Sequence, residues 1–195
     1  ASGAKLRNHT RVAEITSLDD GWLVSLVDEF SGEKQSIKTR CLVNATGVWV
    51  DGLRRQVLNS SGHPNSNSDV ASLVRPSQGV HLVVERSVLP IKKAVLVPQT
   101  MDGRVLFALP WLGSTLIGTT DTPRGDAPLE PQATKDELDF LFQQCHLSLG
   151  VELSPSDVRS VWVGLRPLVN LSPSGKTSQV SREHVTVSYT HLRAH

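Results

Sequence analysis

Cysteine and net charge are both scarce in this chain of 195 residues. Only Cys41 and Cys145 are present, far apart in the sequence, so neither a disulfide framework nor a zinc cluster is expected. Two unpaired cysteines favour a reducing compartment, and we predict a cytoplasmic protein. The formal net charge is +1, which argues against a large binding surface for nucleic acid or membrane.

Long apolar runs are missing as well. The most apolar stretch, residues 105–118, is interrupted by Pro110 and Gly113 and falls short of the roughly 20 residues that span a membrane. No secretory signal precedes it. Hydrophobic residues make up 38% and charged residues 20%, a composition typical of a soluble globular protein. Because the chain begins with Ala1 rather than methionine, we expect its natural start to lie upstream.

Short strands and a helix are predicted for the N-terminal region. Alternating apolar residues predict strands at 9–16, 22–27 and 37–45, separated by turns rich in Asp and Gly. Apolar spacing then becomes helical from Val48 to Val57. Residues 59–73 are rich in Ser, Asn, Gly and Pro in their first part, which predicts a linker.

A second region of different character follows the linker. The pattern predicts an antiparallel sheet with strands at 79–85, 94–98, 104–109 and 114–119, with a hairpin turn at 101–103. An amphipathic helix is predicted over 134–149, with Leu138, Leu141, Phe142, Cys145 and Leu149 on one face. A last strand is expected at 157–169, interrupted by Gly164 and Pro167.

The last nine residues, 187–195, match one reading frame of a common transposon-type sequencing adapter. We treat them as an artefact and exclude them from the fold. Tyr189, His191 and His195 are thereby removed from the candidate functional residues.

The first motif that could bind a ligand is Asn44–Gly47, which follows an apolar run and opens the predicted helix. Small residues permit close approach of the backbone to a ligand, and a helix start favours anionic groups. The alternative is an ordinary strand-to-helix turn in which Gly47 takes a positive φ, and the pattern by itself favours that alternative.

Polar residues of the second region supply the remaining candidates. His81 shares a strand face with Val83 and Glu85 and can take a proton from a substrate hydroxyl, although a structural histidine is the commoner case. Arg166, at the end of an apolar strand, needs an anion, which is either a substrate phosphate or carboxylate or a protein carboxylate. Asp121 suits an Asx turn. The other histidines lack metal-ligand spacing, so no metal is predicted.

Several short motifs occur in the order found in one flavoenzyme family. They are Val43–Trp49, Gln78–His81, Asp102–Phe107 with Pro110–Trp111, Ile117–Asp121 and Gly164–Leu168. Over residues 11–183 the chain resembles the FAD-dependent glycerol-3-phosphate dehydrogenases, of the D-amino-acid-oxidase-like flavoprotein group. Each motif is weak alone, and their shared order makes the resemblance specific.

The resemblance implies a fold of mixed α/β and α+β type. Residues 1–58 would be the C-terminal part of a glutathione-reductase-like FAD-binding domain, and 74–186 an antiparallel substrate-binding domain with a flanking helix. It implies cofactor contacts at Val12, Ala45, Thr46, Gly47 and Trp49, with Val12 meeting the adenine through its backbone. It also places His81 and Arg166 beside the flavin ring and the substrate, with Arg166 on the phosphate.

The implied reaction is oxidation of sn-glycerol 3-phosphate to dihydroxyacetone phosphate by hydride transfer to FAD. Quinone or oxygen would accept the electrons, and the parent protein would contact the inner face of the cytoplasmic membrane peripherally. The alternatives are an FAD-dependent amine or amino-acid oxidase of the same group, and a non-enzymatic β-rich binding module.

The chain departs from the family pattern in two places, and each departure leads to a prediction. Many members have lysine where this chain has Gln78, which removes a positive charge expected near His81. The Gly-x-Gly-x-x-Gly nucleotide fingerprint and a later Gly-Gly-Lys segment are absent, so we expect this piece alone to be inactive.

Overall fold

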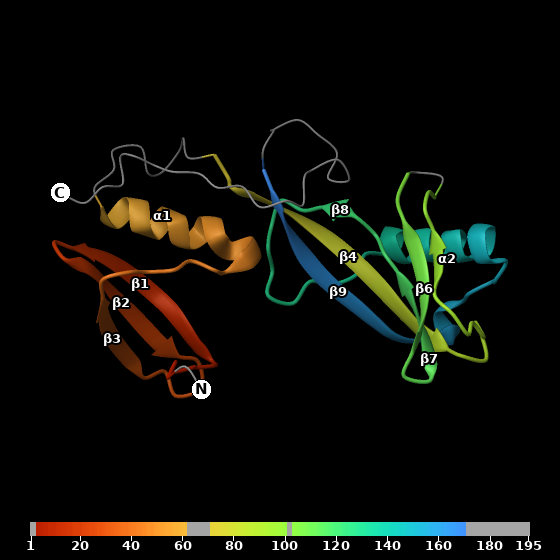
Figure 1. Cartoon of the computed structure of the whole chain (residues 1–195), viewed down its shortest axis with the longest axis horizontal. Helices are drawn as coiled ribbons and strands as arrows, with labels where there is room; N and C mark the ends of the chain where they lie inside the picture. The colour runs from red at the N-terminus through yellow and green to blue at the C-terminus, as the bar shows by residue number, and fades with distance from the viewer. Residues whose placement is uncertain (1–2, 62–70, 101–102, 171–195) are drawn as a thin grey trace. The chain divides into compact units, whose positions relative to one another are not determined.

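The computed structural model describes residues 3–61, 71–100 and 103–170, and these form two compact units (Figure 1). The described part of the first unit ends at Ser72, and the second begins at Leu73. The adapter-like segment 187–195 lies outside the described residues. Among the described helices, none is both long and apolar enough to cross a membrane.

The first unit contains a three-stranded antiparallel meander. Its strands are β1 (Thr10–Leu18), β2 (Gly21–Asp28) and β3 (Lys34–Thr39), in the order β1-β2-β3. Ile15 on β1 lies opposite Val24 on β2, and both are buried. The tight turn into β2 requires Gly21, whose φ is +149° and whose Cβ, if present, would overlap the carbonyl oxygen of Thr39.

The predicted strand at 37–45 is wrong in its second half. β3 begins earlier, at Lys34, and ends at Thr39, after which residues 41–45 have no regular structure. A strand forms only where a neighbouring backbone completes its hydrogen bonds, and no described strand pairs with this apolar run. The helical prediction is confirmed: a 3₁₀ turn, η1 (Gly47–Trp49), leads into α1 (Val50–Ser60).

The second unit is built on one antiparallel sheet. Its strands are β4 (Val74–Glu85), β5 (Val95–Val97), β6 (Leu106–Trp111), β7 (Ser114–Gly118), β8 (Thr122–Pro123) and β9 (Val158–Val169). β4 pairs along one edge with β9 and along the other with β7 and then β8. β6 and β5 extend the sheet beyond β7 (Figure 1). The antiparallel sheet and the β5–β6 hairpin agree with the sequence prediction, although the turn residues 101–102 lie outside the described part.

The last strand, β9, is continuous rather than interrupted. Gly164 lies opposite Gly79, and Pro167 lies opposite Pro76, so the two prolines share one rung of the ladder. Proline has no N–H to donate, and opposing two prolines confines both missing donors to a single position. The pairing partner therefore accommodates residues that we expected to break the strand.

One face of β4 forms the core of the second unit. Val80, Leu82 and Val84 are fully buried and pack with Leu141 and Cys145 of helix α2 (Lys135–Leu149). A capping box sets the start of α2: the Thr134 hydroxyl accepts from the Glu137 N–H, and the Glu137 carboxylate accepts from the Thr134 N–H. The helix ends at Gly150, whose φ is +68°. A 3₁₀ turn, η2 (Pro155–Asp157), precedes β9.

Candidate active site

His81 and Arg166 come together on the face of the sheet opposite α2. The register of β4 and β9 places Trp162 opposite His81 and Arg166 opposite Ser77, and directly opposed residues share a face. A groove of about 330 Å³ is lined by Gly79, His81, Trp162, Val163, Gly164, Leu165 and Arg166. Two candidates from strands far apart in the sequence therefore belong to one site.

The Arg166 guanidinium is held by the short crossover that joins β7 to β8. Its Nη2 donates to the Thr119 hydroxyl at 2.8 Å, and its Nη1 donates to the Thr120 carbonyl at 3.1 Å. The Asp121 carboxylate lies 3.7 Å from Nη1, and the Ser77 hydroxyl donates to the same carboxylate oxygen. A protein carboxylate thus accompanies Arg166, while the arginine side chain stays 27% exposed.

The link from Asp121 to Arg166 was missed by sequence reasoning, which favoured an Asx turn for Asp121. The available signal was the polar run 119–121 directly after an apolar strand. That run shows that the crossover is polar. Only the pairing of β9 with β4 reveals that Arg166 is the residue it meets.

Two glycines make room for the two functional side chains. A Cβ at Gly79 would lie 2.6 Å from the Arg166 Cζ, and a Cβ at Gly118 would lie 2.9 Å from the His81 Nε2. Both distances are shorter than any ordinary contact between such atoms. Glycine is therefore required at both positions if the guanidinium and the imidazole are to lie across the neighbouring strands.

The surroundings of His81 favour its neutral form. Burial lowers the pKa of His81 below the ordinary histidine value, and the positive charge of Arg166 lowers it further. The Phe107 ring lies 5.5 Å away between centroids. A neutral imidazole at neutral pH can accept a proton, which is the property that a general base needs.

Gln78 lies on the opposite face of β4 from His81. Its amide nitrogen donates to the Glu137 carboxylate at 2.7 Å and to the Gln132 carbonyl at 2.9 Å. Burial raises the pKa of Glu137, but hydrogen bonds from Thr134, Thr122 and Gln78 outweigh that effect and lower it. Position 78 therefore faces away from the groove, so the expectation that a lysine here would place a positive charge near His81 is wrong.

The candidate cofactor residues lie in the first unit. Ala45, Thr46 and Gly47 belong to a turn that Asn44 braces, accepting from the Thr46 hydroxyl at 2.8 Å and donating to the Val50 carbonyl at 2.9 Å. Gly47 has the predicted positive φ, +59°, although no strand precedes it, and Trp49 at the end of η1 is 42% exposed. Val12 lies on β1 at a bulge between Val12 and Glu14.

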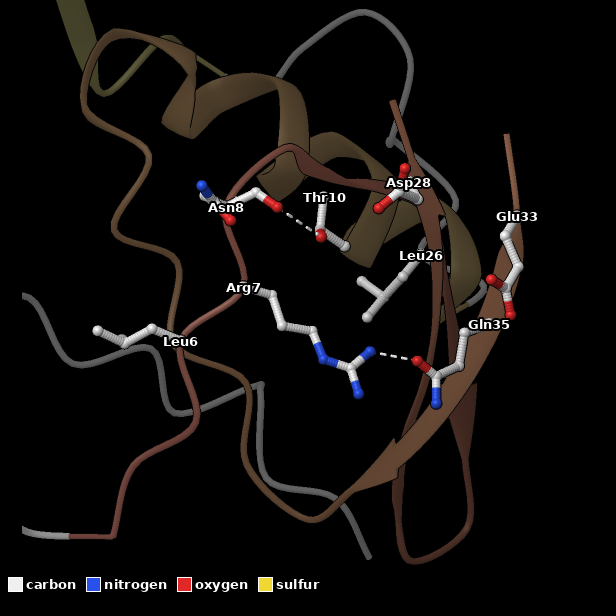
Figure 2. Close-up of a pocket in the computed structure, with 8 residues that line it drawn as sticks. All are labelled: Leu6, Arg7, Asn8, Thr10, Leu26, Asp28, Glu33 and Gln35. Atoms are coloured by element: carbon white, nitrogen blue, oxygen red, sulfur yellow. Dashed lines mark hydrogen bonds between the residues drawn. The ribbon is translucent and has the colours of Figure 1, made fainter. Parts of the chain in front are cut away.

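A separate hollow of about 360 Å³ lies against the β-meander of the first unit (Figure 2). Its lining is Leu6, Arg7, Asn8, Thr10, Leu26, Asp28, Glu33 and Gln35. The Arg7 side chain crosses it and donates to Gln35, as Figure 2 shows. Hydrogen bonds from the backbone N–H groups of Ser31 and Phe30 lower the pKa of Asp28. None of the candidate site residues lines this hollow, and two of its charged side chains are bonded locally, Arg7 to Gln35 and Asp28 to the turn at 30–31.

Potential metal ligands and the buried Cys145 show no second site within the described residues. Over 3–61, 71–100 and 103–170, no three His, Cys, Asp or Glu side chains gather as they would around a metal ion. Burial raises the pKa of Cys145 to about 12, so its thiol is protonated at neutral pH.

Sequence comparison identifies the family. Residues 1–192 match the family described as FAD dependent oxidoreductase. The chain belongs to this family. The mitochondrial glycerol-3-phosphate dehydrogenase of Homo sapiens is 36% identical over 160 residues, which are 81% of this chain and 21% of that protein. The probable mitochondrial glycerol-3-phosphate dehydrogenase of Caenorhabditis elegans is 35% identical over 94% of this chain and 25% of its own length. The chain thus spans about a fifth to a quarter of these relatives.

Solved structures agree with this assignment. The glycerol-3-phosphate dehydrogenase from Bacillus halodurans, complexed with FAD, superimposes with a TM-score of 0.73 at 32% identity, covering 84% of this chain and 32% of that one. The L-alpha-glycerophosphate oxidase from Mycoplasma pneumoniae, with FAD bound, shares the fold with a TM-score of 0.61 at 21% identity, covering 84% and 40%. The resemblance to the FAD-dependent glycerol-3-phosphate dehydrogenases and the predicted fold class are confirmed.

FAD is the cofactor of this family, and two glycines lie side by side in the floor of the groove. A Cβ added to Gly164 would meet nothing within 4 Å, and Gly79 opposite it also lacks a side chain. The floor of the groove is therefore open backbone at Gly164, whereas the Arg166 guanidinium covers Gly79. The open turn at Gly47, whose added Cβ would likewise meet nothing within 4 Å, is compatible with close approach of a ligand.

Proposed function

We propose that the complete enzyme containing this chain oxidises sn-glycerol 3-phosphate to dihydroxyacetone phosphate. Membership of the FAD dependent oxidoreductase family supports an oxidation, and the relatives named above support this substrate. The observation that carries the proposal is the joint placement of His81 and Arg166 on one groove. FAD, when bound, supplies the acceptor for the hydride that leaves C2 of the substrate.

In this proposal Arg166 binds the phosphate. A guanidinium forms paired hydrogen bonds with phosphate oxygens, and the side chain already reaches over Gly79, two residues from His81 along β4. Two residues of a strand span about 7 Å, a length that suits a three-carbon phosphate held between the two side chains. The alcohol end of the substrate would therefore lie at the imidazole.

His81 takes the proton of the C2 hydroxyl as the C2–H bond breaks and the carbonyl forms. The resulting imidazolium lies near the positive charge of Arg166, an arrangement that lowers the His81 pKa when no anion is present. A bound phosphate offsets that charge and makes protonation of His81 less costly. His81 and Arg166 together therefore suit a phosphorylated alcohol substrate better than an uncharged alcohol.

The test is to express the complete reading frame and to measure FAD content and glycerol-3-phosphate-dependent dye reduction. We expect turnover that falls roughly 100-fold to 10,000-fold in His81→Ala, because general-base catalysis contributes about that much. The matched control is His146→Ala, since His146 pairs with Glu152 away from the groove. Full activity of His81→Ala would refute the assigned role, and absence of glycerol 3-phosphate oxidation would refute the function.

The electron acceptor and the location form a second part of the proposal. We infer quinone or oxygen as acceptor and peripheral contact with the inner face of the cytoplasmic membrane. The human and Caenorhabditis elegans relatives are named as mitochondrial proteins, so a cytoplasmic location stays a prediction. Oxygen consumption during turnover would assign oxygen, whereas turnover that requires added quinone would assign quinone. Flotation of the enzyme with phospholipid vesicles would support membrane contact.

A further inference from the structure

The crossover between β7 and β8 forms a cradle for Arg166. Both strands pair with the same edge of β4, so the three residues between them run beside β4. Each of the three presents an oxygen to the guanidinium: the Thr119 hydroxyl, the Thr120 carbonyl and the Asp121 carboxylate. Three consecutive residues thus define where the arginine head lies.

The cradle is anchored from beneath by buried polar groups. The Thr120 side chain is fully buried; its hydroxyl accepts from the Val80 N–H at 3.0 Å and donates to the Glu137 carboxylate at 3.2 Å. Glu137 in turn belongs to the capping box of α2. The crossover is therefore tied both to the central strand and to the helix, which makes it a rigid support.

Asp121 is the charged member of the cradle, and its direction is set by Ser77. The Ser77 side chain is fully buried and donates its hydroxyl hydrogen to the carboxylate oxygen that faces Arg166. At 3.7 Å the carboxylate and the guanidinium attract each other as charges, beyond the range of a normal hydrogen bond. Ser77 also lies directly opposite Arg166 on the paired strands.

We propose that Asp121, oriented by Ser77, is a positioning residue that holds Arg166 ready to receive the phosphate of the substrate. The inference rests on the proposed function, in which Arg166 binds that phosphate. A long flexible side chain loses rotamer freedom when it binds, and fixing it beforehand reduces that loss. The carboxylate also carries a negative charge, so simple charge neutralisation would have the opposite effect and weaken anion binding.

The experiment compares Asp121→Asn with the unaltered, complete FAD-loaded enzyme. Two competitive inhibitors separate the two ends of the substrate: inorganic phosphate probes Arg166, and glycerol probes the alcohol end. We expect the KM for glycerol 3-phosphate and the Ki for phosphate to rise about tenfold, since the wild-type arginine is preorganised. The Ki for glycerol should stay within about twofold, because glycerol makes no demand on Arg166. Ser77→Ala should act in the same direction and more weakly.

The matched control is Asp126→Asn, which removes a carboxylate that pairs with Arg124 at 2.7 Å in the same segment of chain. It should change neither inhibition constant. In an Arg166→Ala background, Asp121→Asn should have no further effect on the Ki for phosphate, because a positioning residue acts only through its partner. A purely structural role would persist in that background.

Several results would overturn the inference. Tighter binding of phosphate by Asp121→Asn would mean that the carboxylate only neutralises Arg166, and a parallel rise of both inhibition constants would mean general disruption. If Arg166→Ala weakens phosphate binding but Asp121→Asn does not, the positioning role alone fails. If Arg166→Ala leaves phosphate binding unchanged, the proposed function fails at its binding residue and the positioning role falls with it.

Discussion

Replacing Gly79 by alanine should lower the activity of the enzyme strongly while changing its folding stability only slightly. The added methyl carbon would lie 2.6 Å from Cζ and 2.7 Å from Nη1 of Arg166, whereas carbon atoms in contact lie about 3.5–4.0 Å apart. The guanidinium must therefore move by about 1 Å. That movement takes it out of register with the Thr119 hydroxyl and the Thr120 carbonyl, which accept its hydrogen bonds at 2.8 and 3.1 Å.

The expected magnitudes differ between function and fold. A misplacement of about 1 Å in a positioning group costs up to about 100-fold in rate, which corresponds to about 2.7 kcal/mol. The free energy of unfolding changes less, because alanine in a strand gains about 0.5–1 kcal/mol relative to glycine. Each displaced hydrogen bond lowers the free energy of unfolding by about 1 kcal/mol, and the gain from alanine offsets part of this loss. With two hydrogen bonds displaced, the net loss of stability should be about 1–1.5 kcal/mol.

The assay is kcat/KM for glycerol 3-phosphate in the complete enzyme, with the melting temperature measured in parallel. Gly125→Ala is the control, because an added Cβ there meets nothing within 4 Å and the position is outside the groove. We expect kcat/KM to fall by up to about 100-fold in Gly79→Ala alone, with a melting temperature within about 6 °C of wild type. Unchanged kcat/KM would refute the reasoning, as would a loss of activity that merely follows unfolding.

The remaining predictions concern pH, packing and the isolated chain. Because the pKa of His81 is lowered by burial and then by Arg166, kcat/KM should fall as the pH drops through a value below the ordinary 6.5 or so of histidine. In Arg166→Ala, an NMR titration should place the His81 pKa higher than in wild type, and an unchanged value would exclude the electrostatic coupling. Leu141→Ala should destabilise the protein by about 2–5 kcal/mol in denaturant titrations, against about 0.5 kcal/mol or less for Leu147→Ala on the exposed side of the same helix. Because the 195-residue chain lacks the Gly-x-Gly-x-x-Gly fingerprint, its purified form should contain little FAD by absorbance, and a yellow, active preparation would contradict that view.

The local pattern of apolar residues was sufficient to predict most strands and the helix of the second unit. The alternation along residues 79–85 predicted a strand with His81, Val83 and Glu85 on one face, and β4 forms there. The ends of α2 could be predicted as well, because the capping residues Thr134 and Gly150 act within one turn of the helix ends. Such features depend on neighbours a few residues away, so they can be predicted without knowledge of the tertiary structure.

Pairing between distant segments decided the rest. Residues 41–45 are as apolar as a strand, yet no described strand pairs with them, whereas β9 stays continuous because Pro167 meets Pro76. The partner of Arg166 depends on β9 lying beside β4, which brings residue 166 to residues 119–121. A strand's hydrogen bonds and a buried charge are both satisfied by groups far away in the chain, and their identity exists only once the tertiary structure has formed.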